Sequence, residues 1–206
     1  MTDAGRQQHW ENVYRDKGEF QVSWFQEEPA VSLDLIRAAG ASRQSSIIDI
    51  GGGASRLADM LLKQDYKDVT VLDLSEAAMS IAKARLAERA AAIVWIAADA
   101  TQWQPQRHYD VWHDRAAFHF LTDVDDRAAY VVRLAQAIRP GGHAIIGTFA
   151  ADGPERCSGL TVVRYDAARL SATLGGAFAL VETRLHDHLT PWGSTQRFQF
   201  SLFKRL

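Results

Sequence analysis

The chain has 206 residues, a formal net charge of −2 and a pI near 6.4. Hydrophobic residues make up 47% of it and charged residues 23%, which is typical of a globular protein, and the length suits a single domain over residues 1–206. The slightly acidic balance argues against a nucleic-acid partner, and no apolar run approaches the roughly 18 residues of a membrane-spanning helix.

The cysteine content and the N-terminal residues predict a cytoplasmic protein with no membrane partner. Cys157 is the single cysteine, so no disulfide can form within the chain, which fits a reducing compartment. We expect this thiol to be unreactive, because a neighbouring Arg156 in sequence is not enough to activate it. The first 20 residues contain no apolar signal core.

Residues 1–45 form an aromatic-rich segment ahead of the predicted core. Trp10, Tyr14, Trp24 and Phe25 lie in this segment, which ends in a stretch with amphipathic helical spacing. Two interpretations stay open, because these side chains can fasten the segment to the domain or form a lid over a ligand. In the second case we expect Trp24 to contact the ligand.

Residues 46–206 predict a Rossmann-like core of alternating strands and helices. Apolar stretches indicate buried strands at 46–50, 68–75, 92–99, 109–113 and 143–150. Helical spacing indicates helices at 55–64, 75–90 and 123–139, the last closed by Pro140 and two glycines. Such alternation is typical of parallel strands joined by right-handed crossovers.

The C-terminal part departs from this alternation. A short helix at 167–175 precedes two long strands at 178–190 and 194–206, with a turn at 191–193. No helix separates the strands, so they predict an antiparallel hairpin on the sheet edge. The expected fold is therefore α/β: a doubly wound, mostly parallel seven-stranded sheet with a C-terminal antiparallel hairpin and helices on both faces.

A glycine-rich turn follows the first predicted strand, in the stretch IIDIGGGASRL. Such a turn lets the backbone approach a ligand at the carboxyl edge of a sheet. The dinucleotide fingerprint requires a third glycine where this chain has Arg56, which disfavours a nicotinamide or flavin cofactor. The Gly-Lys-Ser or Gly-Lys-Thr of a phosphate-binding loop is also absent.

The same stretch resembles motif I of the class I S-adenosylmethionine (SAM) methyltransferases, D/E-x-G-x-G-x-G. Asp49, Gly51 and Gly53 match the motif, and Ser55 replaces its last glycine. The resemblance implies SAM as the cofactor, with Asp49 orienting its ammonium group. The turn Gly51, Gly52 and Gly53 would pass beneath its methionine part.

Two further aspartates follow the second and third predicted strands. Asp73 ends VLDLS, where a carboxylate can accept both ribose hydroxyls, and Leu74 follows it. Asp99 ends the third strand. The resemblance implies that Asp99 accepts the adenine amino group and that the backbone N–H of Ala100 serves a ring nitrogen. A helix cap or a turn is the alternative role of each aspartate.

The fourth strand runs into YDVWHDRAAFHFLTD, beside the expected methyl group. The resemblance implies that Asp114 lies next to the methionine part of SAM. His119 or His113 is the predicted proton acceptor, because histidine titrates near neutral pH. Arg115 can hold an anionic substrate group, or pair with Asp114 or Asp126. The histidine spacing and the lack of a cysteine partner do not predict a metal site.

Three functions are consistent with this sequence. The first is a SAM-dependent methyltransferase acting on a small molecule, since no docking module or basic groove is visible. The second is a protein lysine methyltransferase, in which Glu27, Glu28, Trp24 and Phe25 would surround the acceptor amine. The third is a SAM-binding protein without catalysis.

Overall fold

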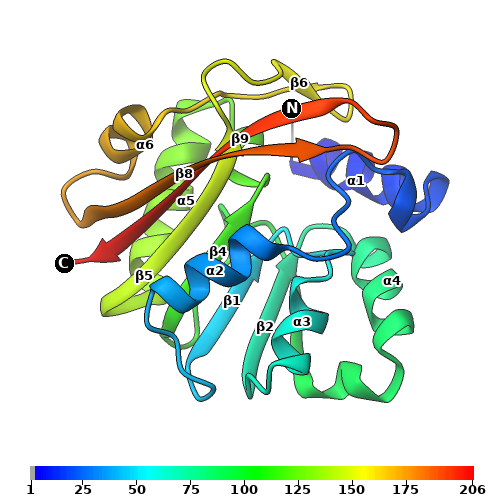
Figure 1. The fold of residues 1–206 in the computed structure, drawn as a ribbon, viewed down its shortest axis with the longest axis horizontal. Helices are drawn as coiled ribbons and strands as arrows, with labels where there is room; N and C mark the ends of the chain where they lie inside the picture. Colours follow the sequence, from blue (N-terminus) through cyan, green and yellow to red (C-terminus); the bar gives the residue numbers. More distant parts are fainter. Residues whose placement is uncertain (1–2) are drawn as a thin grey trace.

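The computed structural model describes residues 3–206, and its elements follow the predicted alternation (Figure 1). The strands are β1 (Ser46–Ile50), β2 (Asp68–Asp73), β3 (Ile93–Ala97), β4 (Tyr109–Arg115), β5 (Ile138–Phe149), β6 (Arg156–Cys157), β7 (Leu160–Thr161), β8 (Phe178–Leu189) and β9 (Thr195–Arg205). The helices are α1 (Asp3–Asp16), α2 (Ala30–Ala38), α3 (Leu57–Lys63), α4 (Glu76–Leu86), α5 (Val124–Ala137) and α6 (Ala167–Leu174). Three 3-10 helices complete the set: η1 (Glu19–Gln21), η2 (Ala87–Ala92) and η3 (Phe118–Phe120).

Seven strands form one sheet in the order β3-β2-β1-β4-β5-β9-β8. The pairs from β3 to β5 are parallel, and β9 runs antiparallel to both β5 and β8. The prediction of a mostly parallel sheet ending in an antiparallel hairpin is confirmed. The last strand of the chain is inserted inside the sheet, so β8 forms the edge. The strand order reverses between β1 and β4, where α/β sheets bind ligands.

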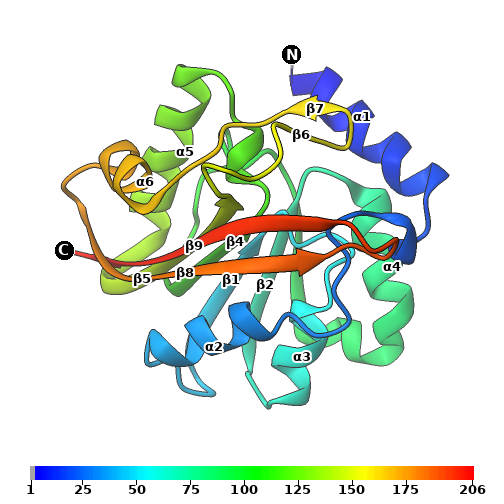
Figure 2. The same ribbon diagram turned by 45° about the horizontal axis from the view of Figure 1, so that its top comes forward.

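Helices cover both faces of the sheet, as predicted. Figure 2 shows the sheet with α5 and α6 on one side and α2 and α3 on the other. Alternate strand residues point to opposite faces, so β1 sends Ile47 toward α2 and α3, and Ile48 toward α5 and α6. Each face has its own hydrophobic cluster, and the side chain of Trp112 is fully buried in the second.

Helix starts follow capping residues in the sequence. The Ser75 hydroxyl caps α4 by accepting a hydrogen bond from the backbone N–H of Ala78. Asp123 and Asp166 cap α5 and α6 in the same way. These caps fix where α4 and α5 begin relative to the strand ends, and hence the positions of the residues just before them.

Three local features differ from the sequence prediction. Residues 3–16 form helix α1, whose mixed polar and aromatic surface has no clear helical periodicity. The segment between β5 and α6, for which no strand was predicted, contains a small β6–β7 hairpin in which Cys157 pairs with Leu160. Helix α5 ends at Ala137, two residues before the predicted end, because Ile138 already pairs with Tyr109 of β4.

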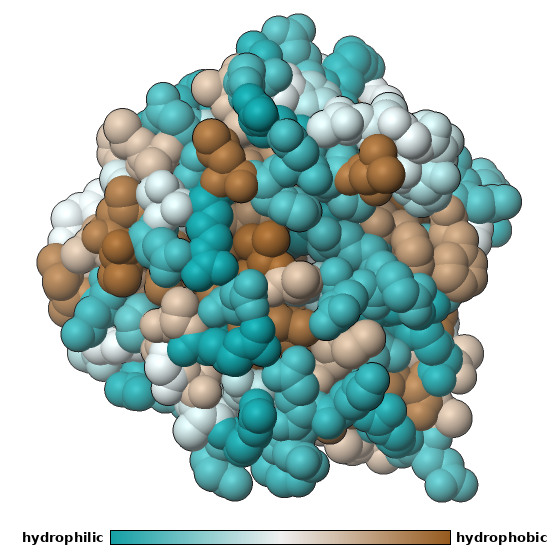
Figure 3. Space-filling view, in the orientation of Figure 1, coloured by the Kyte–Doolittle hydropathy of each residue, from teal (hydrophilic) through white to brown (hydrophobic). Residues whose placement is uncertain are grey.

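The face seen in Figure 3 is largely hydrophilic, with hydrophobic residues in small separate groups. Within residues 3–206, none of the helices combines the length and apolar character that crossing a bilayer requires.

Candidate functional site

Two adjoining cavities lie at the carboxyl edge of the sheet, around the point where the strand order reverses. The first, of about 130 Å³, lies over the ends of β2 and β3, and the second, of about 50 Å³, lies over the ends of β1 and β4. Tyr14, Trp24, Gly51 and Arg115 line both cavities. The strand ends and the N-terminal segment therefore enclose one continuous site.

The predicted glycine turn lies at the junction of the two cavities. Gly51 has a φ of +65°, and a Cβ there would come within 2.8 Å of the Cβ of Ala117. A Cβ on Gly52 would lie 2.5 Å from the Oδ2 atom of Asp49, and one on Gly53 2.7 Å from the Oδ2 atom of Asp73. Side chains would therefore collide with the walls of the turn, which must present bare backbone.

Asp49, at the base of the turn, is held by a chain of hydrogen bonds. Its Oδ1 atom lies 2.7 Å from Nδ1 of His113, and Nε2 of His113 lies 2.8 Å from the Ser32 hydroxyl. All three side chains are buried. Because a carboxylate only accepts, Nδ1 of His113 carries the proton that faces Asp49. The Oδ2 atom of Asp49 is buried and has no hydrogen-bond partner among residues 3–206.

The hydrogen bonds to Asp49 and Ser32 give His113 a positioning role in the observed geometry. Both of its ring nitrogens are engaged, so neither is available to accept a proton from an acceptor group. The parallel register places His113 opposite Asp49, which explains how residues 64 positions apart meet. Ser32 comes from α2 and had no sequence signal that linked it to the site.

Asp73 lines the first cavity from the end of β2. Its Oδ1 atom accepts a hydrogen bond of 2.7 Å from the backbone N–H of Ser75. Burial raises the pKa of this carboxyl to about 7, against the opposing effect of the Ser75 amide. Leu74 lines the same cavity. The structure thus brings both predicted residues to one wall.

Asp99 and Ala100 line the far end of the first cavity. The Oδ1 atom of Asp99 accepts hydrogen bonds from the backbone N–H and the hydroxyl of Thr101, at 2.8 and 2.6 Å. Its Oδ2 atom lies 3.2 Å from Nη2 of Arg6, which also pairs with Asp126. Arg6 belongs to α1, and no pattern in the sequence of α1 indicated this contact.

The N-terminal segment closes the site from above. Trp10 and Tyr14 of α1 line the first cavity together with Trp24, whose Nε1 donates to the Tyr14 hydroxyl at 3.1 Å. The carboxylate of Glu11 accepts from the backbone N–H of Glu76 at the start of α4, which fastens α1 to the core. These aromatics therefore both fasten the segment and form the cavity wall. Movement of the segment as a lid stays a prediction.

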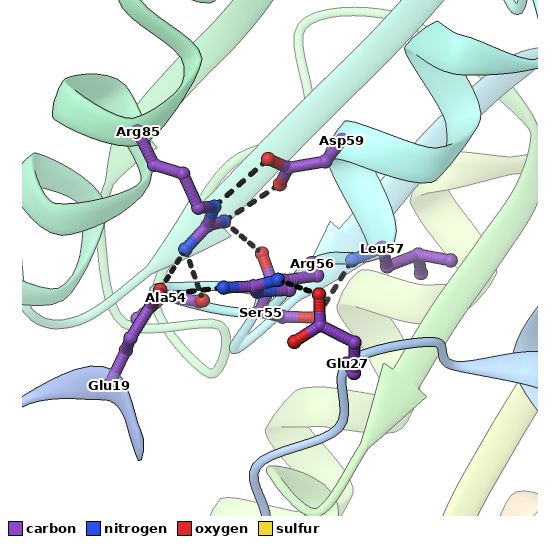
Figure 4. A network of polar contacts seen from close by, with 8 residues as sticks. All are labelled: Glu19, Glu27, Ala54, Ser55, Arg56, Leu57, Asp59 and Arg85. Carbon is purple, nitrogen blue, oxygen red and sulfur yellow. Dashed lines mark hydrogen bonds and ion pairs between the residues drawn. The ribbon is translucent and has the colours of Figure 1, made fainter.

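An ion-pair network holds the outer side of the glycine turn (Figure 4). Arg85 of α4 contacts both carboxylate oxygens of Asp59 and the backbone oxygens of Ala54 and Ser55, while Glu19 pairs with it. Glu19 also pairs with Arg56, at 2.9 Å. Arg56, which disfavoured a dinucleotide cofactor, thus ties the turn to the segment above it.

Asp114 supports the end of β4 from below and lines neither cavity. It accepts hydrogen bonds from the Tyr130 hydroxyl, at 2.6 Å, and from the backbone N–H groups of Ala117 and Phe118. Burial raises its pKa to about 6. Ala116, between these contacts, has a φ of +68°, which is strained for a residue with a side chain. Asp114 holds this turn against the cavity, and the expected pair with Arg115 does not form.

His119 lies behind the cavity wall and not in it. The side chain is fully buried, and its ring packs on Phe120 and Phe149. Its Nδ1 accepts a 3.3 Å hydrogen bond from the Phe149 N–H, and Nε2 has no partner among residues 3–206. Burial and then the charge of Arg115 lower its pKa to about 3. His119 is therefore neutral, and its role as proton acceptor stays a prediction.

Cys157 lines the first cavity, and burial raises the pKa of its thiol to about 11. The thiol is therefore protonated at neutral pH, as expected for an unreactive cysteine. No group of three or more metal-ligating side chains was found within residues 3–206.

Comparison with known proteins finds a family match over part of the chain. Residues 47–142 match a family model described as a methyltransferase domain. A ubiquinone biosynthesis O-methyltransferase from Serratia proteamaculans is 26% identical over 159 residues, which cover 75% of this chain and 58% of the relative. The chain thus spans less than two thirds of the length of this curated relative.

Solved structures share the fold at low sequence identity. Burkholderia thailandensis 1,6-didemethyltoxoflavin-N1-methyltransferase, solved with 1,6-didemethyltoxoflavin and S-adenosylhomocysteine (SAH), has a TM-score of 0.76 and 20% identity, covering 98% of this chain and 88% of that one. The N-methyltransferase NodS from Bradyrhizobium japonicum, in complex with SAH, has a TM-score of 0.72 and 19% identity, covering 96% and 98%. The family match over residues 47–142 and the shared fold agree with the resemblance of the glycine turn to motif I of the class I SAM-dependent methyltransferases.

Proposed function

We propose that this protein transfers a methyl group from SAM to a small-molecule acceptor. The observation that carries the proposal is the pair of adjoining cavities around the glycine turn, with carboxylates on one side and aromatic walls on the other. An enclosed aromatic site of this kind suits a small acceptor better than a protein side chain. The small-molecule chemistry in the names of the relatives supports the same choice. A cytoplasmic location is part of the proposal.

The residues present fit SAM at each part of the molecule. The unpartnered Oδ2 atom of Asp49 is a buried acceptor suited to an ammonium group, and the bare glycine turn leaves room beside it. Asp73 would accept the ribose hydroxyls, and Asp99 with the N–H of Ala100 would face the adenine. The remaining contacts would come from Gly51, Gly52, Gly53, Leu74 and Trp24. Asp114 would act on this site only through the turn that it supports.

The chain itself supplies orientation and exclusion of water. When bound, SAM provides an electrophilic methyl group. The aromatic walls of Trp10 and Trp24 would hold an acceptor in line with that group and keep water out. In the observed geometry His113 is engaged at both nitrogens and His119 is covered by the cavity wall. Acceptors that need no strong base for methylation therefore suit the site best.

Incubation with methyl-labelled SAM and a cell extract tests the proposal. Label in the small-molecule fraction is the expected result, and it should disappear with the Asp73→Ala variant. Label in the protein fraction would favour the lysine methyltransferase. Binding of SAH by calorimetry without any transfer of label would favour a non-catalytic SAM-binding protein.

A further inference from the structure

Arg115 is a cation at the site that forms no ion pair with a carboxylate of residues 3–206. Its Nη1 donates to the backbone oxygen of Trp24 at 2.8 Å. Its Nε and Nη2 are shielded from solvent and have no hydrogen-bond partner among residues 3–206. Arg56 and Arg85, in contrast, each contact two carboxylates. A shielded guanidinium with unused donors costs stability unless a ligand supplies the partner.

The Arg115 side chain lines both cavities and extends from the end of β4 toward β9. Arg115 lies opposite Gly147 of β5, which has no side chain to block it. The side chain reaches across to β9, where its guanidinium carbon lies 4.8 Å from the centre of the Phe198 ring. β9 is two strands beyond β4, or about 10 Å at the usual strand spacing. The unused donors therefore belong to the part of the site where an acceptor would lie.

The carboxylate of Asp49 attracts Arg115 without forming an ion pair with it, and the other neighbouring titratable groups are neutral. His188 donates to the Ser23 backbone oxygen, and burial lowers its pKa to about 4, so it is neutral. Burial also lowers the pKa of His186 and raises the pKa values of Tyr14 and Cys157, which keeps all three neutral. Burial lowers the pKa of Arg115 itself only to about 10, so its charge persists at neutral pH.

We propose that Arg115 binds the carboxylate of an aromatic carboxylic acid that is the methyl acceptor. A guanidinium matches a carboxylate with two parallel N–H donors, here Nε and Nη2. The apolar part of the acceptor would pack against Trp10, Trp24 and Phe120, which line the first cavity. The amino-acid end of SAM also carries a carboxylate. The extension of Arg115 toward β9 favours the carboxylate of the acceptor as its partner. This inference rests on the proposed function.

Calorimetric titration of the full chain with simple acids tests the assignment. Benzoate, phenylacetate and 3-phenylpropionate are compared with their uncharged amides, each with and without saturating SAH. A charge-assisted pair in a shielded site predicts binding of at least one acid about 10- to 100-fold tighter than its amide. Arg115→Met should remove this preference for the acid. Arg115→Lys should retain only part of it, because lysine lacks the two parallel N–H donors of a guanidinium. The matched control Arg89→Met changes an exposed arginine that lines neither cavity.

The outcomes separate this inference from the proposed function. Equal binding of every acid and its amide, or an unchanged preference in Arg115→Met, overturns the carboxylate site. An SAH affinity that falls about 10-fold or more in Arg115→Met assigns the carboxylate to the cofactor and overturns the acceptor site. Failure of the wild-type chain to bind SAH defeats the proposed function, while the titrations without SAH still decide the preference for acids.

Discussion

The two halves of the site differ in charge and in how they are built. The carboxylate half consists of the ends of β1, β2 and β3, with Asp49, Asp73 and Asp99. The cationic half consists of the ends of β4, β5 and β9, with Arg115 above Phe198. The first half obtains its chemistry from residues at or just after strand ends. The second obtains it from residues that only the sheet register brings together. A cofactor that many enzymes share is bound by a sequence pattern that recurs among them, whereas the residues that bind an acceptor can differ from one enzyme to the next.

Removal of Asp73 should have the largest effect, and it tests the carboxylate half directly. A carboxylate that accepts two ribose hydroxyls contributes about 3 kcal/mol, so Asp73→Ala should weaken SAH binding about 100-fold by calorimetry. Asp68→Ala is the matched control, since Asp68 lies at the other end of the same strand and pairs with Arg107. Similar SAH affinities for the two variants would contradict the ribose assignment.

The pH dependence of SAH binding sharpens the same assignment. The pKa of Asp73 is raised to about 7, and only the ionised form accepts both hydroxyls. SAH affinity should therefore fall about 10-fold between pH 8 and pH 6. The stability of the protein without ligand should change with pH in the opposite direction. A raised carboxyl pKa stabilises the fold at low pH, and this stabilisation is lost as pH rises through about 7. Asp73→Asn should flatten both profiles, and an unchanged binding profile would show that another group titrates.

His119 provides a test of the cationic half. Its pKa is lowered to about 3, so it is neutral in the fold and protonated in the unfolded chain below pH 6.5. The contribution of His119 to the free energy of unfolding is present above pH 6.5 and should fall by about 1.5 kcal/mol by pH 5. The variant His119→Phe should lose less stability than wild type over this range in urea denaturation. His108→Phe, at an exposed site, should behave as wild type.

Turnover separates the two interpretations of His119. If the residue only packs against Phe120 and Phe149, His119→Phe should retain both SAH affinity and transfer of label from SAM. Loss of transfer with intact SAH affinity would instead support the predicted role as proton acceptor, which would require that the wall over His119 open during the reaction.

The sequence was sufficient for the fold and for placing the aspartates at the edge of the sheet, because both depend on local patterns. Asp73 was identified because it ends an apolar strand, and the glycine turn because only glycine fits its walls. The partners Ser32 and Arg6 were not identified, because their contacts are 81 and 93 residues away in the chain. His119 carried a family-like pattern, yet the packing of Phe120 in front of it depends on the tertiary structure.

The smallest expected effect concerns the ion pairs that join the N-terminal segment to the glycine turn. Glu19 is 13% exposed and pairs with both Arg56 and Arg85, whereas Glu27 is 70% exposed and pairs with Arg56 alone. Glu19→Gln should lower the free energy of unfolding by about 1–2 kcal/mol, and Glu27→Gln by about 0.5 kcal/mol or less, since exposed pairs contribute little. Urea denaturation measures both. Equal losses would mean that the segment is held mainly by its aromatic contacts, and then changes at Trp10 or Trp24, and not in this network, would control access to the site.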